Sequence, residues 1–223
     1  MIKIKILFFL LISLNSFSQT ARDYYKIGAD NYNRLTGEGE KIPDGKIHEV
    51  YKKALMGYSK AIELTPNYSL PYYSRAVLLN NFGGEDNDFY SCISDLTRAI
   101  ELKPEARYYS LRALCKGSLK DFNSAVEDLS KAIKLDPSNF NHWLGRGSYK
   151  IKIGDFYGSI SDCSIAIEIS DLEYQKATAL MNRALAKHGL KDNKGACDDL
   201  NKSLDLGYDR TPEEVKNLIK ICN

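Results

Sequence analysis

The sequence lacks the residue clusters on which most enzyme and metal sites are built. Its three histidines, His48, His142 and His188, are so far apart that no two fall on one helical turn. The five cysteines form no C-x-x-C pair, which removes the usual zinc and redox motifs. The chain has no G-x-S-x-G nucleophile turn, no S-x-x-K motif and no phosphate-binding glycine loop. We therefore expect no enzymatic activity, no metal ion and no cofactor.

Long apolar runs are also rare, and the one at the N-terminus predicts export. Lys3 and Lys5 precede a short apolar run, and Ser16-Phe17-Ser18 follows it as a small-x-small cleavage site. This order is typical of a secretory signal peptide, and the run is too short to span a membrane. We expect residues 1–18 to be removed, residues 19–223 to form the mature protein, and the location to be periplasmic or secreted.

The mature chain has no excess of either charge. Without Lys3 and Lys5, the 31 basic residues of the whole chain become 29, which equals the 29 acidic ones. A balanced surface gives no reason to expect nucleic acid or an anionic membrane as a partner. These classes of binding protein are therefore not predicted.

What the sequence does contain is one segment written five times. Each copy has a small residue, an aspartate or its substitute three residues later, a large apolar residue, and then a small-apolar pair. The small residues of these pairs are separated by 38, 33, 34 and 37 positions, and they are Ala61, Ala99, Ala132, Ala166 and Ser203. A period of this size indicates a supersecondary unit that is copied and stacked.

The fourth copy predicts two helices in each unit. Apolar and small residues recur at three- and four-residue steps on both sides of Gly154-Asp155. Gly154 supplies a permissive turn, and Asp155 can cap the second helix. Small residues at Gly147, Ser159 and Ala166 allow the two helices to approach closely.

At these positions the chain resembles the tetratricopeptide repeat (TPR) family. The third copy carries the family pattern most completely, with Tyr109, Ala113, Leu119, Phe122, Ala125, Leu129, Ala132 and Pro137. The resemblance implies an all-α fold, a right-handed superhelical solenoid of antiparallel helix pairs. We expect repeats at about 21–66, 69–104, 106–137, 140–170 and 174–208, with polar loops at 36–46 and 83–88.

A further helix is expected over residues 212–222, where it would cap the last repeat. Thr211-Pro212-Glu213 has the signals of a helix start, and Val215, Leu218, Ile219 and Cys222 fall on one side. Cys92 and Cys163 occupy repeat positions that other copies fill with Ala, Ser or Leu, so we expect buried thiols there. A Cys197–Cys222 bridge that ties down the C-terminus is the main exception to be tested.

Arginine and aspartate occur together in four of the five copies. Copies two to five have an arginine in the first helix and an aspartate in the second, and copy one has neither. We therefore expect partly buried ion pairs between the helices, within one repeat or across neighbours. The alternative is that the arginines bind an anionic ligand. The eight residues are Arg75, Asp95, Arg112, Asp128, Arg146, Asp162, Arg183 and Asp199.

The resemblance also implies a concave groove lined by the first helix of each repeat. By position, the predicted groove residues are Tyr25, Tyr32, Tyr73, Asn80, Arg107, Leu114, Leu144, Ser148, Lys152, Met181 and His188. The set is apolar to weakly basic, which suits a protein or peptide partner. We expect a non-catalytic scaffold that is a monomer or a weak homo-oligomer. The alternative is a cell-envelope carbohydrate binder or enzyme accessory protein that uses the N-terminal tyrosines.

Overall fold

The computed structural model of this protein describes residues 20–43, 45–83, 86–209 and 213–222, and it contains helices but no strand in those ranges. The first helix covers residues 20–36. The others are α2 (Ile47–Leu64), α3 (Ser69–Phe82), α4 (Asp86–Leu102), α5 (Ala106–Ser118), α6 (Phe122–Leu135), α7 (Phe140–Lys152), α8 (Phe156–Ile169), α9 (Glu173–Gly189), α10 (Asn193–Asp205) and α11 (Glu213–Cys222). Each range expected for a repeat holds two of these helices.

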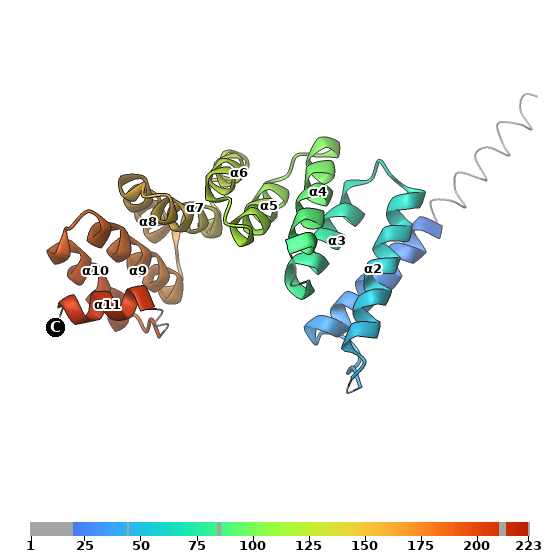
Figure 1. Ribbon diagram of the computed structural model, residues 1–223, viewed down its shortest axis with the longest axis horizontal. Helices are drawn as coiled ribbons and strands as arrows, with labels where there is room; N and C mark the ends of the chain where they lie inside the picture. Colours follow the sequence, from blue (N-terminus) through green and yellow to red (C-terminus); the bar gives the residue numbers. More distant parts are fainter. Residues whose placement is uncertain (1–19, 44, 84–85, 210–212, 223) are drawn as a thin grey trace, which may run out of the picture. The chain divides into compact units, whose positions relative to one another are not determined.

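The helices form two compact units along the chain (Figure 1). The first unit ends at Pro104 and contains the helix over residues 20–36 together with α2, α3 and α4. The second begins at Glu105 and contains α5 to α11. Within each unit, helices that follow one another in sequence pack together. The predicted fold class, an all-α solenoid of antiparallel helix pairs, is confirmed.

The turns inside the three repeats of the second unit share one design. Asp121, Asp155 and Asp192 each cap the second helix by accepting a hydrogen bond from the backbone N–H three residues later. The residue before each aspartate has a positive φ of 61–79° at Lys120, Gly154 and Lys191. The predicted turn at Gly154-Asp155 is therefore present, and two lysines adopt the backbone conformation that favours glycine.

Small side chains set the distance between paired helices. Ala125, Ala132, Ala166, Ala184 and Ala196 are fully buried at the helix contacts. A Cβ atom on Gly147 would lie 3.0 Å from the Cys163 sulfur, so this glycine allows α7 and α8 to touch. Large side chains such as Leu129 and Leu200 fill the space beside them, and burying each contributes about 1.5–3 kcal/mol.

The polar loop predicted over residues 83–88 is shorter than expected. The helix α4 begins at Asp86, so residues 86–88 belong to its first turn and not to a loop. Asp86 and Asp88 near a helix N-terminus interact favourably with the helix dipole, which explains why this acidic run is helical. The loop was predicted from the polar composition of these residues, which does not distinguish a loop from the first turn of a helix.

The cysteine prediction is correct for Cys163 and wrong for Cys92. Cys163 is a free, buried thiol, whereas Cys92 and Cys115 are both disulfide-bonded. A repeat position specifies that a side chain is small and buried, but it does not specify which atom lies opposite. Cys197 and Cys222 form a disulfide with a Cα–Cα distance of 5.4 Å.

The C-terminal helix α11 covers the end of the last repeat. Val215 and Leu218 are fully buried against Met181, Ala196 and Leu200 of α9 and α10. The helix therefore has the capping role that its apolar side predicts. The predicted helix start at Thr211-Pro212 and the signal peptide lie outside the described residues. In the described ranges, no helix has the length and apolar character needed to cross a membrane.

Candidate functional site

The four arginine–aspartate pairs fix how the first helix of a repeat is rotated against the second. In each pair the arginine Nε and Nη2 donate to both carboxylate oxygens of the aspartate in the same repeat, at 2.7–2.8 Å. The four aspartates are 1–5% exposed. The sequence left open whether these pairs form within one repeat or between neighbouring repeats, and the structure shows that they form within one repeat. Each arginine side chain is therefore turned toward the second helix of its own repeat.

The arginines also connect successive repeats. Arg75, Arg146 and Arg183 use Nη1 to donate to a serine on the second helix of the preceding repeat. The acceptors are Ser59, Ser130 and Ser164, each at 3.0 Å. Sequence analysis missed these serines, although each directly follows the large apolar residue of its copy.

In the second unit a lysine joins each buried aspartate as a second cation. Lys116, Lys150 and Lys187 lie 2.7–3.0 Å from Asp128, Asp162 and Asp199. Each lysine comes four residues after the arginine of its helix, so both side chains lie on the same helix face. This spacing is visible in the sequence and could have predicted the second cation. Each aspartate is thus matched by two cations, which leaves the group with a net positive charge.

These contacts favour the ionised carboxylates of Asp128 and Asp199. Burial would raise the pKa of Asp128, but hydrogen bonds from Arg112 and Lys116 outweigh it and lower that pKa below its ordinary value. The pKa of Asp199 is lowered in the same way against burial by Arg183 and Lys187. The arginines are therefore occupied by structural partners and are poorly suited to capture a free anion.

With the arginines turned toward the second helices, the side chains two and five positions later face the opposite side. In α7 and α9 these are Ser148, Ile151, Leu185 and His188, and the two helices contact each other. Together they line a pocket of about 480 Å³, the α7–α9 pocket. Among the residues that the structure describes, the lining consists of Ser148, Ile151, Lys152, Asn182, Leu185, His188, Gly189 and Asn217.

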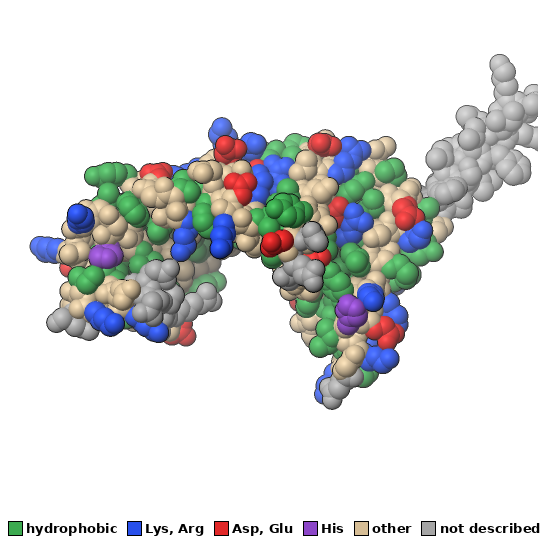
Figure 2. All heavy atoms as spheres, viewed as in Figure 1, with side chains coloured by type: hydrophobic (Ala, Val, Ile, Leu, Met, Phe, Trp, Pro, Cys, Tyr) green, Lys and Arg blue, Asp and Glu red, His purple; other side chains and the backbone are tan. Residues whose placement is uncertain are grey.

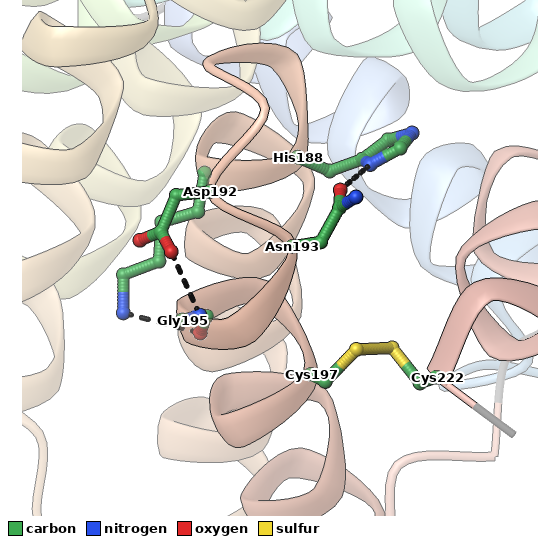
Figure 3. Close-up of a disulfide and its surroundings, with 7 residues drawn as sticks. His188, Asp192, Asn193, Gly195, Cys197 and Cys222 are labelled. Atoms are coloured by element: carbon green, nitrogen blue, oxygen red, sulfur yellow. Dashed lines mark hydrogen bonds between the residues drawn. A yellow bond between two sulfur atoms is a disulfide. The ribbon is translucent and has the colours of Figure 1, made fainter.

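Three hydrogen bonds hold polar groups of the α7–α9 pocket. Asn182 Nδ2 donates to Ser148 Oγ at 2.7 Å, and Ser148 Oγ donates to the carbonyl of Leu144 at 2.9 Å. His188 Nδ1 lies 3.1 Å from Asn193 Oδ1 (Figure 3). An amide oxygen can only accept, so Nδ1 donates in this hydrogen bond.

The described part of the pocket lining carries basic but no acidic side chains. Lys152, which is part of this lining, is exposed. Figure 2 shows basic side chains and a histidine beside hydrophobic surface on this unit. The pocket therefore combines an apolar wall, from Ile151 and Leu185, with amide, hydroxyl and basic groups.

The C-terminal helix supplies one wall of the pocket. Asn217 of α11 is part of the lining, between the buried anchors Val215 and Leu218. The Cys197–Cys222 disulfide joins this helix to α10 (Figure 3). Sequence analysis missed both Asn182 and Asn217 as pocket residues, the latter because it comes from the cap and not from a repeat.

The predicted groove residues do not all line this pocket. Ser148, Lys152 and His188 do, but Met181 is 1% exposed and packs against α11, so its assignment to an open groove is corrected. The cap buries this position, whereas Leu144 at the equivalent position of the preceding repeat is half-buried. Leu144 lines a smaller neighbouring hollow of about 240 Å³. Leu114 is 48% exposed on α5 but belongs to neither lining.

Arg107 and the predicted residues of the first unit lie outside the α7–α9 pocket. Arg107 is exposed and pairs with Glu105 at 2.7 Å. Tyr25 and Tyr32 are half-buried, hydrogen-bonded to Ser74 and Asn81 at 3.1 and 2.9 Å. Tyr73 and Asn80 are half-buried on α3.

The first unit has its own hollow of about 640 Å³. It lies next to the predicted tyrosines but is lined by a different set: Leu35, Gly45, Ile47, His48, Tyr51, Phe82, Gly83 and Asp88. Burial and the nearby Asp88 raise the pKa of Tyr51. Tyr32 packs edge-on against Phe82 and Tyr25 against Tyr58, so these rings fill seams between helices.

The geometry is that of a helical-repeat protein with an apolar-to-basic pocket on its first-helix side, and comparisons with known proteins agree with this fold. Residues 106–139 match the family model of the tetratricopeptide repeat. This segment contains the third copy, which carries the fullest pattern in the sequence. No curated protein matches the chain significantly.

Solved structures share the fold at low sequence identity. The chain is similar to MamA, with a TM-score of 0.69 and 18% identity over 87% of this chain and 99% of that one. It is also similar to YrrB, with a TM-score of 0.68 and 17% identity over 88% and 90%. For PilF of Pseudomonas aeruginosa the TM-score is 0.64, with 12% identity over 87% and 80%. These likenesses support the tetratricopeptide-repeat resemblance at the level of the fold.

Proposed function

We propose that this chain is a non-catalytic binding protein that holds a peptide or a segment of a partner protein in the α7–α9 pocket. The observation that carries the proposal is the pocket itself, which brings Ser148, Lys152 and His188 together beside an apolar wall. Its volume of about 480 Å³ lies within the range of ligand sites. It is large enough for one or two side chains and too small for a folded domain.

Each part of the pocket has a role in holding an extended segment. Ile151 and Leu185 can cover an apolar side chain, and each 100 Å² of apolar surface that is buried contributes about 2.5 kcal/mol. The Asn182 amide can hydrogen-bond a peptide backbone while it keeps its bond to Ser148. Lys152 favours a nearby carboxylate over an ammonium group. The expected ligand is thus an extended segment with an apolar side chain and no excess of basic residues.

A solved structure with this fold supports a peptide as the ligand. YrrB, which shares the fold, is described as a TPR protein with an unusual peptide-binding site. The identity of 17% brings only the architecture to this chain. The assignment of a peptide here rests on the pocket's own residues.

We further propose that the protein is exported and acts in a periplasmic or secreted location. The N-terminal sequence pattern supports a signal peptide. Cys92, Cys115, Cys197 and Cys222 are disulfide-bonded, and disulfides persist mainly in oxidising compartments. N-terminal sequencing of the protein from its native envelope should begin at Gln19; a first residue of Met1 would contradict export.

The carbohydrate-binding alternative receives less support. It requires exposed tyrosine rings on which a sugar can stack, but Tyr25 and Tyr32 are half-buried and pack against other rings. Tyr72 is also half-buried and donates to the Pro66 carbonyl at 3.2 Å. We therefore retain the peptide as the proposed ligand.

A peptide selection with matched variants tests the function. Peptides would be selected from a random phage library on the immobilised full-length chain, and their affinities measured by fluorescence anisotropy. Lys152→Glu and Leu185→Ala should weaken binding about tenfold each, since each removes about 1.4 kcal/mol of contact. Leu114→Ala is the control, because Leu114 holds the same repeat position as Leu185 but lies outside the lining.

The outcomes separate the pocket from the rest of the surface. Circular dichroism confirms that each variant keeps the helical fold. If Leu114→Ala weakens binding as much as Leu185→Ala, the ligand lies along a broader surface and the pocket assignment is wrong. If no peptide is enriched on the wild-type chain over a blank surface, peptide binding itself is rejected.

A further inference from the structure

Two attachments hold the helix α11 in place: apolar packing and a disulfide bond. Val215 and Leu218 are fully buried in the cluster formed with Met181, Ala184, Ala196 and Leu200. The Cys197–Cys222 disulfide ties the last turn of α11 to α10. A helix of ten residues is too short to be stable alone in water, so its structure depends on these two attachments.

These attachments also determine the shape of the α7–α9 pocket. Asn217 lies on α11 between its two buried anchors and forms one wall. His188, another lining residue, is also linked to the disulfide. Its hydrogen-bond partner Asn193 lies on α10, one turn before Cys197 (Figure 3). The disulfide thus connects the two helices that supply and orient parts of the pocket.

The disulfide is positioned where a reductant can reach it. Cys197 and Cys222 are half-buried, whereas the free Cys163 has no exposed surface. The thiolate of a dithiol reductant can attack one sulfur of the bridge to form a mixed disulfide, and the other cysteine leaves as a thiolate and takes up a proton. The second thiol of the reductant then closes its own disulfide, leaving two cysteine thiols on the protein.

We propose that the Cys197–Cys222 disulfide is a redox latch for the α7–α9 pocket. When it is oxidised, α11 stays docked and Asn217 completes the pocket. When a dithiol reduces it, α11 undocks more often, the pocket loses this wall, and ligand binding weakens. This regulation rests on the proposed function, because it acts on the same pocket.

Hydrogen–deuterium exchange tests the latch without any ligand. The full-length chain would be compared with a Cys197→Ser/Cys222→Ser variant, and with a Cys163→Ser control that leaves the disulfides intact. Loss of a bridge between residues 25 positions apart should speed exchange in residues 213–222 by about tenfold to a hundredfold. Exchange in residues 122–135 of α6 should not change.

The variant is needed because reduction of the wild-type chain has a second target. Cys92 and Cys115 are also disulfide-bonded, so dithiothreitol alone would not isolate the effect of the C-terminal bridge. The double variant removes that bridge only. Wild-type protein in dithiothreitol should reproduce the faster exchange of residues 213–222 that the variant shows.

The outcomes distinguish the latch from the proposed function. Unchanged exchange in residues 213–222 of both the variant and the reduced protein would overturn the latch, whatever the peptide result. Faster exchange with unchanged affinity for the selected peptides would show that α11 opens without controlling the pocket, which also overturns it. Faster exchange with affinity at least about fivefold weaker supports it, since the affinity then depends on the bridge. If no peptide is enriched, the proposed function fails and, with it, the claim that the latch regulates binding.

Discussion

Asp198 and Asp199 are neighbours in α10 with opposite surroundings. Asp199 is 2% exposed and bound by Arg183 and Lys187, whereas Asp198 is exposed. Asp199→Ala should lower the free energy of unfolding by about 3–5 kcal/mol, because it leaves two desolvated cations without a partner. Asp198→Ala should change it by less than about 0.5 kcal/mol. Urea denaturation followed by circular dichroism measures both, and equal effects would show that the ion pair is not important for stability.

His142 should make the protein sensitive to mild acid. Its ring is 3% exposed, neither nitrogen has a hydrogen-bond partner among the described residues, and burial lowers its pKa although Asp136 lies 3.9 Å away. A lowered pKa means that the unfolded chain binds the proton more readily, so stability falls as the pH drops below 6.5. The loss can reach about 1.4 kcal/mol per pH unit.

His142→Phe provides the test of this pH dependence. The variant should lose less stability than the wild type between about pH 7.5 and pH 5.5, because the group that gains a proton on unfolding is gone. Asp128 and Asp199 do not compete in this range, since their lowered pKa values provide stability that is lost only at lower pH. Thermal denaturation at the two pH values measures the difference; parallel losses in both proteins would exclude His142 as the cause.

At the scale of helices, the arginine–serine bonds should hold neighbouring repeats together. Ser164 of α8 accepts from Arg183 Nη1 and donates to the Ile160 carbonyl, whereas Ser161 on the same helix is exposed. Ser164→Ala should cost about 1–3 kcal/mol, because a partly buried guanidinium donor loses its acceptor. Ser161→Ala is the control and should be neutral. Urea denaturation compares the two, and a neutral Ser164→Ala would show that the bond does not couple the repeats.

The first repeat uses contact between backbones where the others use an ion pair. Gly57 stands at the aspartate position of its copy, and a Cβ atom there would lie 2.5 Å from the Gly28 nitrogen and 2.8 Å from the Tyr24 carbonyl oxygen. Gly57→Ala should therefore separate α2 from the helix over residues 20–36 and cost about 1–3 kcal/mol. Met56→Ala, at an adjacent exposed position, should have little effect on the melting temperature. An unchanged melting temperature in Gly57→Ala would contradict the close packing.

The sequence predicts the helices well because their period and caps are local signals. The turn at Gly154-Asp155 and the apolar side of α11 can be recognised without knowledge of the fold. The pocket is harder to predict, since Asn217 comes from the cap and enters the lining only when α11 docks. Met181 illustrates the same limit, because its repeat position predicts an open groove and the cap buries it.

At the scale of the whole molecule, the repeat pattern predicts that a cysteine is buried, but the tertiary fold decides whether it forms a disulfide. Cys92 holds the small-residue position of its copy, and Cys163 holds the position one turn later in its own copy. Both are buried, yet Cys92 is oxidised and Cys163 is a free thiol. Local sequence fixes the burial of such a residue. The identity of the residue opposite depends on how the chain folds as a whole, which a local sequence pattern does not reveal.

The oxidation state of the five cysteines gives a quantitative test at this scale. Four cysteines are disulfide-bonded and Cys163 is free, with burial raising the pKa of its thiol to about 12. Iodoacetamide should therefore label no cysteine in the folded protein, because the thiol is both inaccessible and protonated. In denaturant without reductant it should label Cys163 alone, and after reduction all five cysteines. Mass spectrometry of the protein from its native compartment counts these adducts. More than one label in denaturant alone would mean that a disulfide is not formed there, and peptide mapping would show whether the C-terminal latch is the open one.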